Sequence, residues 1–123
     1  MTFIFNYSFT TLNQYINKER GNRYAAAKIK KTETEFVHYS AISQNKERKT
    51  IDYPVIVKFT WNEKNKRTDP DNIDFAKKFI LDGLVKANVI IDDTAKYIYG
   101  FTNHFTYGNK ERSVKVELVE VRK

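Results

Sequence analysis

Residues 67–72, RTDPDN, place two aspartates, Asp69 and Asp71, one residue apart. A second acidic pair, Asp92 and Asp93, directly follows an apolar run later in the chain. Carboxylates held within a few ångströms of one another repel, and each raises the pKa of the other unless a cation lies among them. Oxygen-only clusters of this kind suit Mg²⁺ or Mn²⁺, which lower the pKa of bound water and neutralise charge that develops on a phosphodiester. These acids therefore indicate metal-assisted cleavage of a phosphodiester.

The segment that follows Asp71 predicts a helix over residues 72–87. Each helical residue advances roughly 100°, so Lys78 and Asp82 return to within about 20° of Asp71. Apolar side chains cluster near the opposite direction: Ile73, Ala76, Ile80, Leu84 and Ala87. If the chain returns Asp92 and Asp93 beside the start of this helix, four carboxylates gather there.

A simpler interpretation of the same face stays open. Acids around a lysine are usually a solvated surface with i,i+4 ion pairs, here Asp74 with Lys78 and Lys78 with Asp82. Asp69 or Asp71 is also a suitable N-cap for the helix. On this interpretation the acids stabilise a helix and bind no ligand.

The chain as a whole is basic. Its 123 residues include 22 Lys and Arg against 15 Asp and Glu, which gives a formal net charge of +7. Such a surface attracts polyanions, and nucleic acid is the commonest of them, with an anionic membrane as the rival. Lysines and arginines would attract nucleic acid, and metal ions would reduce the repulsion between the aspartates and the phosphates of the nucleic acid.

Composition also limits the cofactor and the compartment. The chain has no cysteine, which excludes disulfides and thiolate metal sites. Neither His38 nor His104 is spaced with a second histidine, so a metal would be held by carboxylate oxygen. No apolar run approaches the roughly 20 residues of a membrane span, and the N-terminus lacks the regions of a signal peptide. We expect a cytoplasmic protein without a membrane partner.

The hydrophobic pattern predicts one α+β domain over residues 1–123. We expect a strand at 3–7, a polar loop or broken helix at 10–22, a basic amphipathic helix at 23–43 and a strand at 53–61. The helix at 72–87 is then followed by two strands joined in a hairpin around Gly108-Asn109. The order β-α-β-α-β-β predicts a mixed sheet with two main helices. Alternation of Tyr97, Tyr99 and Phe101 favours packing in the core or at a dimer interface.

The stretch Asp69 to Asp93, DPDNIDFAKKFILDGLVKANVIIDD, resembles the RusA-like Holliday junction resolvases. The pattern of that family is D-x-D-N, a helical lysine, D-[AG]-L and an apolar stretch that ends in D-D. The N-terminal LNQYINKERGNRYAAAKIKK is similar to the loop with Asn and Arg that leads into the first helix of the family. The resemblance implies a RusA-like fold and a homodimeric, Mg²⁺- or Mn²⁺-dependent endonuclease. Such an enzyme resolves branched DNA by paired symmetric nicks in recombination and repair.

The resemblance also implies roles for individual residues. Asp69 and Asp71 match the aspartates of D-x-D-N, and Asp93 matches the second aspartate of D-D, so these would be catalytic metal ligands with Asp92 as a fourth. The interval between D-x-D-N and D-G-L is longer here than in the best-known member. Aligning backward from Asp82 selects Lys78 rather than Lys77 as the catalytic lysine. Lys78 would hold or polarise the scissile phosphate.

Basic and polar residues near these motifs are candidates for DNA contact: Asn13, Arg20, Arg23, Lys66 and Arg67, with Lys30 and Lys31 as further candidates. The chain lacks the Pro-Pro-Ser run of the family before Asn13, and Asn103-His104 stand where a late basic residue is often seen.

An alternative function is a non-enzymatic RNA- or DNA-binding module. Residues 99–105, YGFTNHF, loosely resemble the aromatic strand of an RNA recognition motif. That motif has Lys or Arg before the glycine and apolar residues at the positions of Thr102 and Asn103, so the match is partial.

Overall fold

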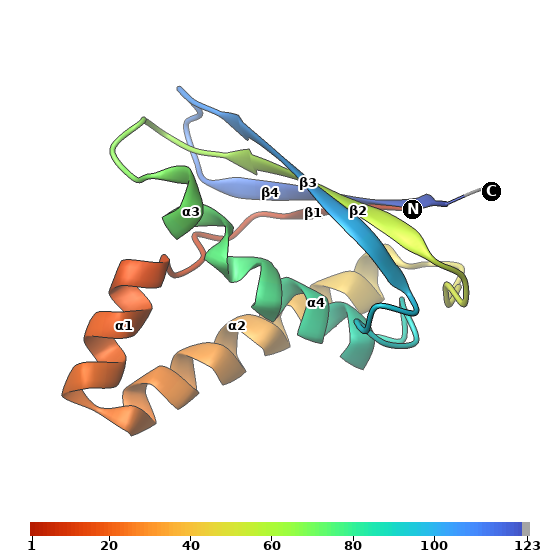
Figure 1. Cartoon of the computed structure of the whole chain (residues 1–123), viewed down its shortest axis with the longest axis horizontal. Helices are drawn as coiled ribbons and strands as arrows, with labels where there is room; N and C mark the ends of the chain where they lie inside the picture. The colour runs from red at the N-terminus through yellow and green to blue at the C-terminus, as the bar shows by residue number, and fades with distance from the viewer. Residues whose placement is uncertain (122–123) are drawn as a thin grey trace.

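A layer of helices covers one face of a four-stranded mixed sheet in the computed structural model, which describes residues 1–121 (Figure 1). The elements are β1 (Thr2–Phe5), α1 (Leu12–Gly21), α2 (Arg23–Gln44), β2 (Val55–Asn62), α3 (Pro70–Ile73), a 3-10 turn η1 (Asp74–Ala76), α4 (Lys77–Lys86), β3 (Ile98–Thr106) and β4 (Ser113–Glu120). The α+β fold class is confirmed. Among the residues described, no helix combines the length and apolarity needed to cross a membrane.

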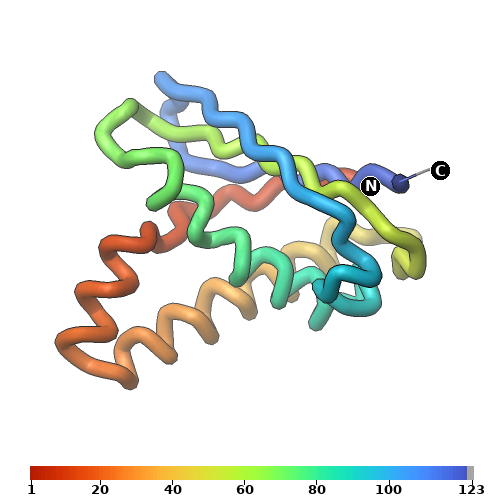
Figure 2. Tube along the Cα trace, in the orientation of Figure 1, coloured from red at the N-terminus to blue at the C-terminus, as the bar shows by residue number. Residues whose placement is uncertain are grey.

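The sheet has the order β1-β4-β2-β3, with β2 parallel to β3 and antiparallel to β4. The predicted hairpin between the last two strands is therefore wrong, because β2 lies between them. A turn is present as expected, with Gly108 at φ 82°. The N–H groups of Gly108 and Asn109 donate to the carbonyls of Lys64 and Glu63, so the chain crosses the end of β2. The path of the tube in Figure 2 shows this crossing.

Period-two alternation places one face of each inner strand in the core, as predicted. The side chains of Val55, Val57 and Phe59 in β2 are fully buried, and that of Trp61 is almost fully buried. The neighbouring strands add Phe3, Phe5, Val114, Val116 and Leu118 to the same face. The helices close this core with Val37, Ala41, Phe79, Ile80 and Leu84. The opposite face of the sheet carries no helix (Figure 1).

Residues 12–44 form two helices, so the segment before Arg23 is a continuous helix rather than the polar loop or broken helix expected, and the break falls at Asn22. Thr11 begins α1 with a capping box: its hydroxyl accepts from the Gln14 N–H, and the Gln14 side chain accepts from the Thr11 N–H. Asn22 ends α1 and begins α2, because its side chain accepts a hydrogen bond from the Tyr24 N–H. The helix predicted at 72–87 is also interrupted, because the 3-10 turn η1 separates α3 from α4.

Helices α2 and α4 approach closely at Gly83. A Cβ atom at that position would lie 2.5 Å from the Cβ of Val37 and 2.9 Å from the carbonyl oxygen of Thr34. Both contacts are shorter than ordinary packing allows, and one of them is to backbone. The glycine of the D-G-L motif is therefore required by helix packing in this chain.

A buried polar network links the chain after β1 to the end of β2 and to the connection between β3 and β4. Arg112 donates to both carboxylate oxygens of Glu63, at 3.0 and 3.2 Å, and to the carbonyl of Phe9. Glu33 accepts from the N–H and the hydroxyl of Thr10. Burial is the main cause that raises the pKa of the Glu33 carboxyl, and the Thr10 hydrogen bonds oppose it.

Replacing Gly83 with alanine should destabilise the fold by about 1–3 kcal/mol, because the helices must move apart to admit the methyl group. Gly21→Ala is the matched control, since a Cβ at Gly21 meets nothing within 4 Å. Urea denaturation measures both. A Gly83→Ala protein as stable as the control would show that the close approach of the two helices is not a constraint.

Glu33→Gln should change how stability depends on pH. A raised folded-state pKa means that Glu33 favours folding when protonated, so its contribution is present below its usual value of 4.5 and is lost as pH rises through the folded value. The variant keeps an acceptor for Thr10 but has no such loss. The stability of the original chain, relative to Glu33→Gln, should therefore fall from acidic to neutral pH in denaturation series. A difference that stays constant with pH would contradict this assignment.

Candidate active site

Among residues 1–121, the two carboxylates of the acidic segment at the start of α3, Asp69 and Asp71, have no hydrogen-bond or ion-pair partner. Asp69 occupies the N-cap position, with extended backbone and Pro70 following as the first helical residue, but its side chain makes no capping hydrogen bond. Its carbonyl instead accepts from the N–H groups of Asn72 and Ile73. Asp71 is exposed in the first turn. Capping by a side chain therefore does not account for either aspartate.

Asn72 joins this segment to the N-terminal helix. The N–H of Asn13, in the first turn of α1, donates to the Asn72 side-chain oxygen at 3.0 Å. The asparagine of D-x-D-N thus caps a helix 59 residues away in sequence. The interaction places the candidate residue Asn13 beside the acidic segment. No local pattern indicated it, because the two residues meet only through the tertiary fold.

Lys78 connects α4 to the second acidic pair. Its ammonium lies 3.0 Å from a carboxylate oxygen of Asp82 and 3.3 Å from one of Asp93. The hydrogen bond with Asp82 is the largest cause that raises the pKa of Lys78, and Asp93 adds to it. The ion pair of Lys78 with Asp82 is one of the two i,i+4 pairs that the simpler interpretation of this helix face predicts. The Asp93 contact spans 15 residues and brings the loop after α4 onto the helix.

Lys77 has a different environment from its neighbour. Its ammonium lies 4.8 Å from the ring centroid of Phe101 and 5.6 Å from that of Phe59, with Asp74 at 3.9 Å. The expected pair of Asp74 with Lys78 is thus replaced by Asp74 with Lys77, because the 3-10 turn changes the angular spacing before α4. The same turn occupies the longer interval between D-x-D-N and D-G-L. Lys77 packs on the aromatic surface of the sheet, whereas Lys78 remains beside the acids.

A hollow of about 530 Å³ between α2 and α4 contains the second acidic pair. Its lining is acidic and basic together: Asp82, Asp92, Asp93, Lys30, Lys31 and Lys86, with Ala27, Thr34 and Val85. Both Asp92 and Asp93 are half-buried, and the Asp92 carboxylate accepts from the Asp93 N–H. Lys86 was missed in the sequence, although it follows Asp82 at i+4 on the same helix. The hollow offers lysines to an anion at its rim and carboxylates to a cation within it.

The fit of a divalent metal depends on the kind and the placement of the donors. Carboxylates are suitable donors for Mg²⁺ or Mn²⁺, and those of Asp69 and Asp71 are unused by other contacts. Within residues 1–121, however, no three acidic or histidine side chains converge as a ready-made metal group. The carboxylate oxygens of Asp69, Asp71, Asp92 and Asp93 are suitable donors for a divalent metal. Their convergence on one ion stays a prediction.

The candidate DNA-contact residues lie at one end of the long axis. Arg20 lies in the last turn of α1 and Arg23 begins α2, while Lys66 and Arg67 are exposed in the connection from β2 to α3. Figure 1 shows the junction of α1 with α2 and the connection from β2 to α3 at the same end of the molecule. The Lys66 ammonium lies 5.4 Å from the ring centroid of Tyr107. Exposure of all four cations leaves them available to a phosphate backbone.

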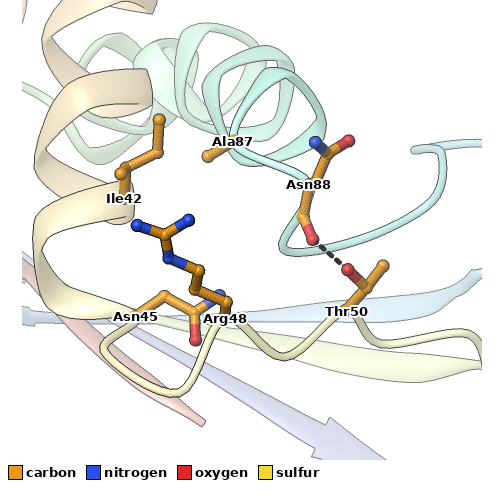
Figure 3. Close-up of a pocket in the computed structure, with 6 residues that line it drawn as sticks. All are labelled: Ile42, Asn45, Arg48, Thr50, Ala87 and Asn88. Atoms are coloured by element: carbon orange, nitrogen blue, oxygen red, sulfur yellow. Dashed lines mark hydrogen bonds between the residues drawn. The ribbon is translucent and has the colours of Figure 1, made fainter.

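A separate hollow lies between the C-terminal ends of α2 and α4 (Figure 3). It is lined by Ile42, Asn45, Arg48, Thr50, Ala87 and Asn88, and the Thr50 hydroxyl donates to the Asn88 carbonyl at 2.7 Å. The guanidinium of Arg48 points into it between the two helix ends, whose carbonyls favour a cation. None of the predicted site residues lines this hollow, so it is not part of the candidate site.

Comparison with known proteins adds no relative: no protein-family model matches the chain, and no curated protein matches it. The candidate site therefore rests on the residue pattern and on the contacts of the structure.

Removing the acid beside Lys78 should leave the fold intact. Asp93→Asn should cost less than about 1 kcal/mol, because the Lys78 side chain is largely exposed and its pairs are screened by water. Glu63→Gln should instead cost about 3 kcal/mol, since it leaves Arg112 without its buried carboxylate. Urea denaturation of both variants gives the comparison. An Asp93→Asn protein that loses as much stability as Glu63→Gln would identify Asp93 as a structural residue.

Proposed function

We propose that the protein is a metal-dependent, structure-selective endodeoxyribonuclease that resolves Holliday junctions as a homodimer, by paired symmetric nicks, in DNA recombination and repair. The observation that carries the proposal is the contact of Lys78 with Asp93, which joins two elements of the RusA-like motif. The carboxylates of Asp69 and Asp71 at the start of α3, which have no partner among the residues described, support it.

In this proposal the lysine and arginine side chains bind and orient the DNA. Arg20, Arg23, Lys66 and Arg67 contact backbone phosphates, while Lys30 and Lys86 draw a phosphate toward the hollow. The raised pKa of Lys78 keeps its side chain as an ammonium at neutral pH. Lys78 then exchanges one carboxylate partner for an oxygen of the scissile phosphate and stabilises the charge that develops there.

Asp69, Asp71, Asp92 and Asp93 would hold Mg²⁺ or Mn²⁺, which supplies Lewis-acid stabilisation of the phosphate and a bound water of lowered pKa. The four acids also require positively charged side chains nearby. Four carboxylates repel the phosphates of DNA, so the surrounding cations must offset this repulsion for the backbone to approach. In the hollow, Lys30, Lys31 and Lys86 lie beside Asp92 and Asp93 and would offset the repulsion from these two acids.

The non-enzymatic binding module receives less support. Phe105 pairs with Trp61, and Phe101 with Val57, so these rings lie on the face of the sheet that the helices cover. A base-stacking sheet surface needs its aromatic rings on an open face. The partial resemblance of residues 99–105 to an RNA recognition motif is therefore not matched by the arrangement of its rings.

Asp71→Asn should abolish cleavage of a labelled four-way junction in Mg²⁺ or Mn²⁺ while DNA binding is kept or strengthened, because one negative charge near the phosphates is removed. Asp52→Asn is the matched control: it removes the same charge from an exposed aspartate on the connection between α2 and β2. The control should cut as the original chain does. Gel analysis of nicked and shifted junctions measures both steps.

Chelator should stop cleavage and Ca²⁺ should support binding with little cutting, because its looser coordination positions the reacting groups poorly. Full activity in chelator would exclude the metal-dependent reaction. A shifted junction with no cleavage in either metal would favour the non-enzymatic module.

A further inference from the structure

The two edge strands of the sheet, β1 and β3, differ in how far their outer main-chain groups are hydrogen-bonded. At the β1 edge, the side chain of Gln44 from the end of α2 pairs with the main chain of Ile4: the Ile4 N–H donates to Gln44 Oε1 at 2.9 Å, and Gln44 Nε2 donates to the Ile4 carbonyl at 2.7 Å. These are the two hydrogen bonds that another strand would make there. The side-chain amide therefore closes this edge against a further strand.

The β3 edge lacks such a cover among the residues described. Of the helices and strands, β3 packs extensively only against β2. Its nine residues, IYGFTNHFT, include no Lys, Arg, Asp or Glu. Tyr99 is 68% exposed and Phe101 43% exposed. Proteins usually protect an open edge with charges, proline or a very short strand, and β3 has none of these.

One irregularity is confined to the start of this strand. Ile98 pairs with Val55 and Gly100 with Ile56, so Tyr99 is an extra residue that bulges. From Gly100 to Thr106 the register with β2 is regular. The outer side of this regular part presents N–H and C=O groups that the sheet itself does not pair.

We propose that a second copy of this chain binds the β3 edge as an antiparallel strand, about a two-fold axis near Thr102. The pairing joins two four-stranded sheets into one continuous sheet. Identical strands that pair antiparallel form a closed dimer, and antiparallel ladders are slightly more stable than parallel ones. Edge pairing therefore ends at two copies, because the other edge of each sheet is closed by Gln44.

Charge favours a second copy over nucleic acid as the occupant. Each chain carries a formal charge of +7, so two copies repel over most of their surfaces. The uncharged β3 is the strand along which they can approach with least repulsion, and it offers no cation to a phosphate. Thr102 is the middle residue of β3 (Ile98–Thr106), so an axis there pairs the strand along its whole length. At such an axis each Thr102 faces its copy across the two antiparallel strands.

The pairing has a geometric consequence for the candidate site. A two-fold axis that relates antiparallel edge strands runs perpendicular to the sheet, so both helical layers lie on the same face. The beginning of α4 is close to β3, since the Lys77 ammonium lies 4.8 Å from the Phe101 ring. The two candidate sites would therefore flank the axis on one face, as two symmetric nicks require. This last step rests on the proposed function, whereas the pairing itself does not.

Cysteine cross-linking tests the pairing directly, because the chain has no cysteine of its own. Single substitutions at Gly100, Phe101, Thr102, Asn103 and His104 are oxidised mildly, and linked dimer is measured on non-reducing gels. In an antiparallel two-fold pair only residues near the axis face their own copy, so the yield should peak at or beside Thr102→Cys. Ile4→Cys, at a side chain that is 51% exposed on the closed β1 edge, is the control and should give no linked dimer. A yield no higher than this control at every β3 position would overturn the proposal.

Sedimentation equilibrium with a matched pair of variants gives the second test. Tyr99→Lys should weaken dimerisation by at least about tenfold, because it places a charge at the edge of each copy. Tyr24→Lys adds the same charge at a tyrosine that is 87% exposed on α2, and should leave the dimer unchanged. Added salt should strengthen the dimer by screening the repulsion between the copies, whereas it should weaken DNA binding.

The outcomes separate this inference from the proposed function. A dimer that cross-links through β3 but does not cut junctions supports the interface and rejects the nuclease. A protein that cuts junctions yet remains monomeric at all concentrations keeps the nuclease and rejects the interface. Equal effects of Tyr99→Lys and Tyr24→Lys on association would also reject it.

Discussion

The fold depends on burying one face of β2. Val55, Val57, Phe59 and Trp61 lie within the protein with almost no exposure, which requires a strand on each side of β2 and helices over its inner face. The connection after β3 therefore crosses the end of β2 and delivers β4 to its other side. Arg112 and Glu63 secure this crossing with a buried ion pair, and Gly108 supplies the left-handed turn within it. Burial of large apolar side chains outweighs the local preference of neighbouring strands for a hairpin.

Packing of α4 on this core sets the position of the candidate site. Phe79, Ile80 and Leu84 face the core, which turns Lys78 and Asp82 outward. Consecutive residues of a helix point about 100° apart, so Lys77 and Lys78 lie in different surroundings. Lys77 covers the rings of Phe59 and Phe101, whereas Lys78 contacts the acids.

The charged residues of the chain are concentrated on some surfaces and absent from others. Lysines surround the acidic hollow between α2 and α4, exposed arginines stand at the junction of α1 and α2, and β3 has no Lys, Arg, Asp or Glu. A basic surface suits a polyanion, and an uncharged strand suits a second copy of a chain that otherwise repels itself. The proposed nuclease and the proposed dimer therefore use different surfaces of one small domain, and neither surface competes with the other.

The sequence by itself determined the local features of this protein. Alternation in residues 55–61 indicated the buried strand, helical spacing indicated the apolar face of α4, and the i,i+4 spacing indicated the Lys78–Asp82 pair. These features depend on neighbours within a few residues. The motif from Asp69 to Asp93 also indicated which acids to examine, although their convergence on a metal stays a prediction.

Only the tertiary structure decided the contacts between distant segments. The insertion of β2 between β3 and β4, the capping of α1 by Asn72, the contact of Lys78 with Asp93 and the closure of the β1 edge by Gln44 all join residues far apart in sequence. Each is selected by the burial of the whole core rather than by local preference. Because no residue pattern within one segment encodes its distant partner, these contacts are absent from any local analysis of the chain.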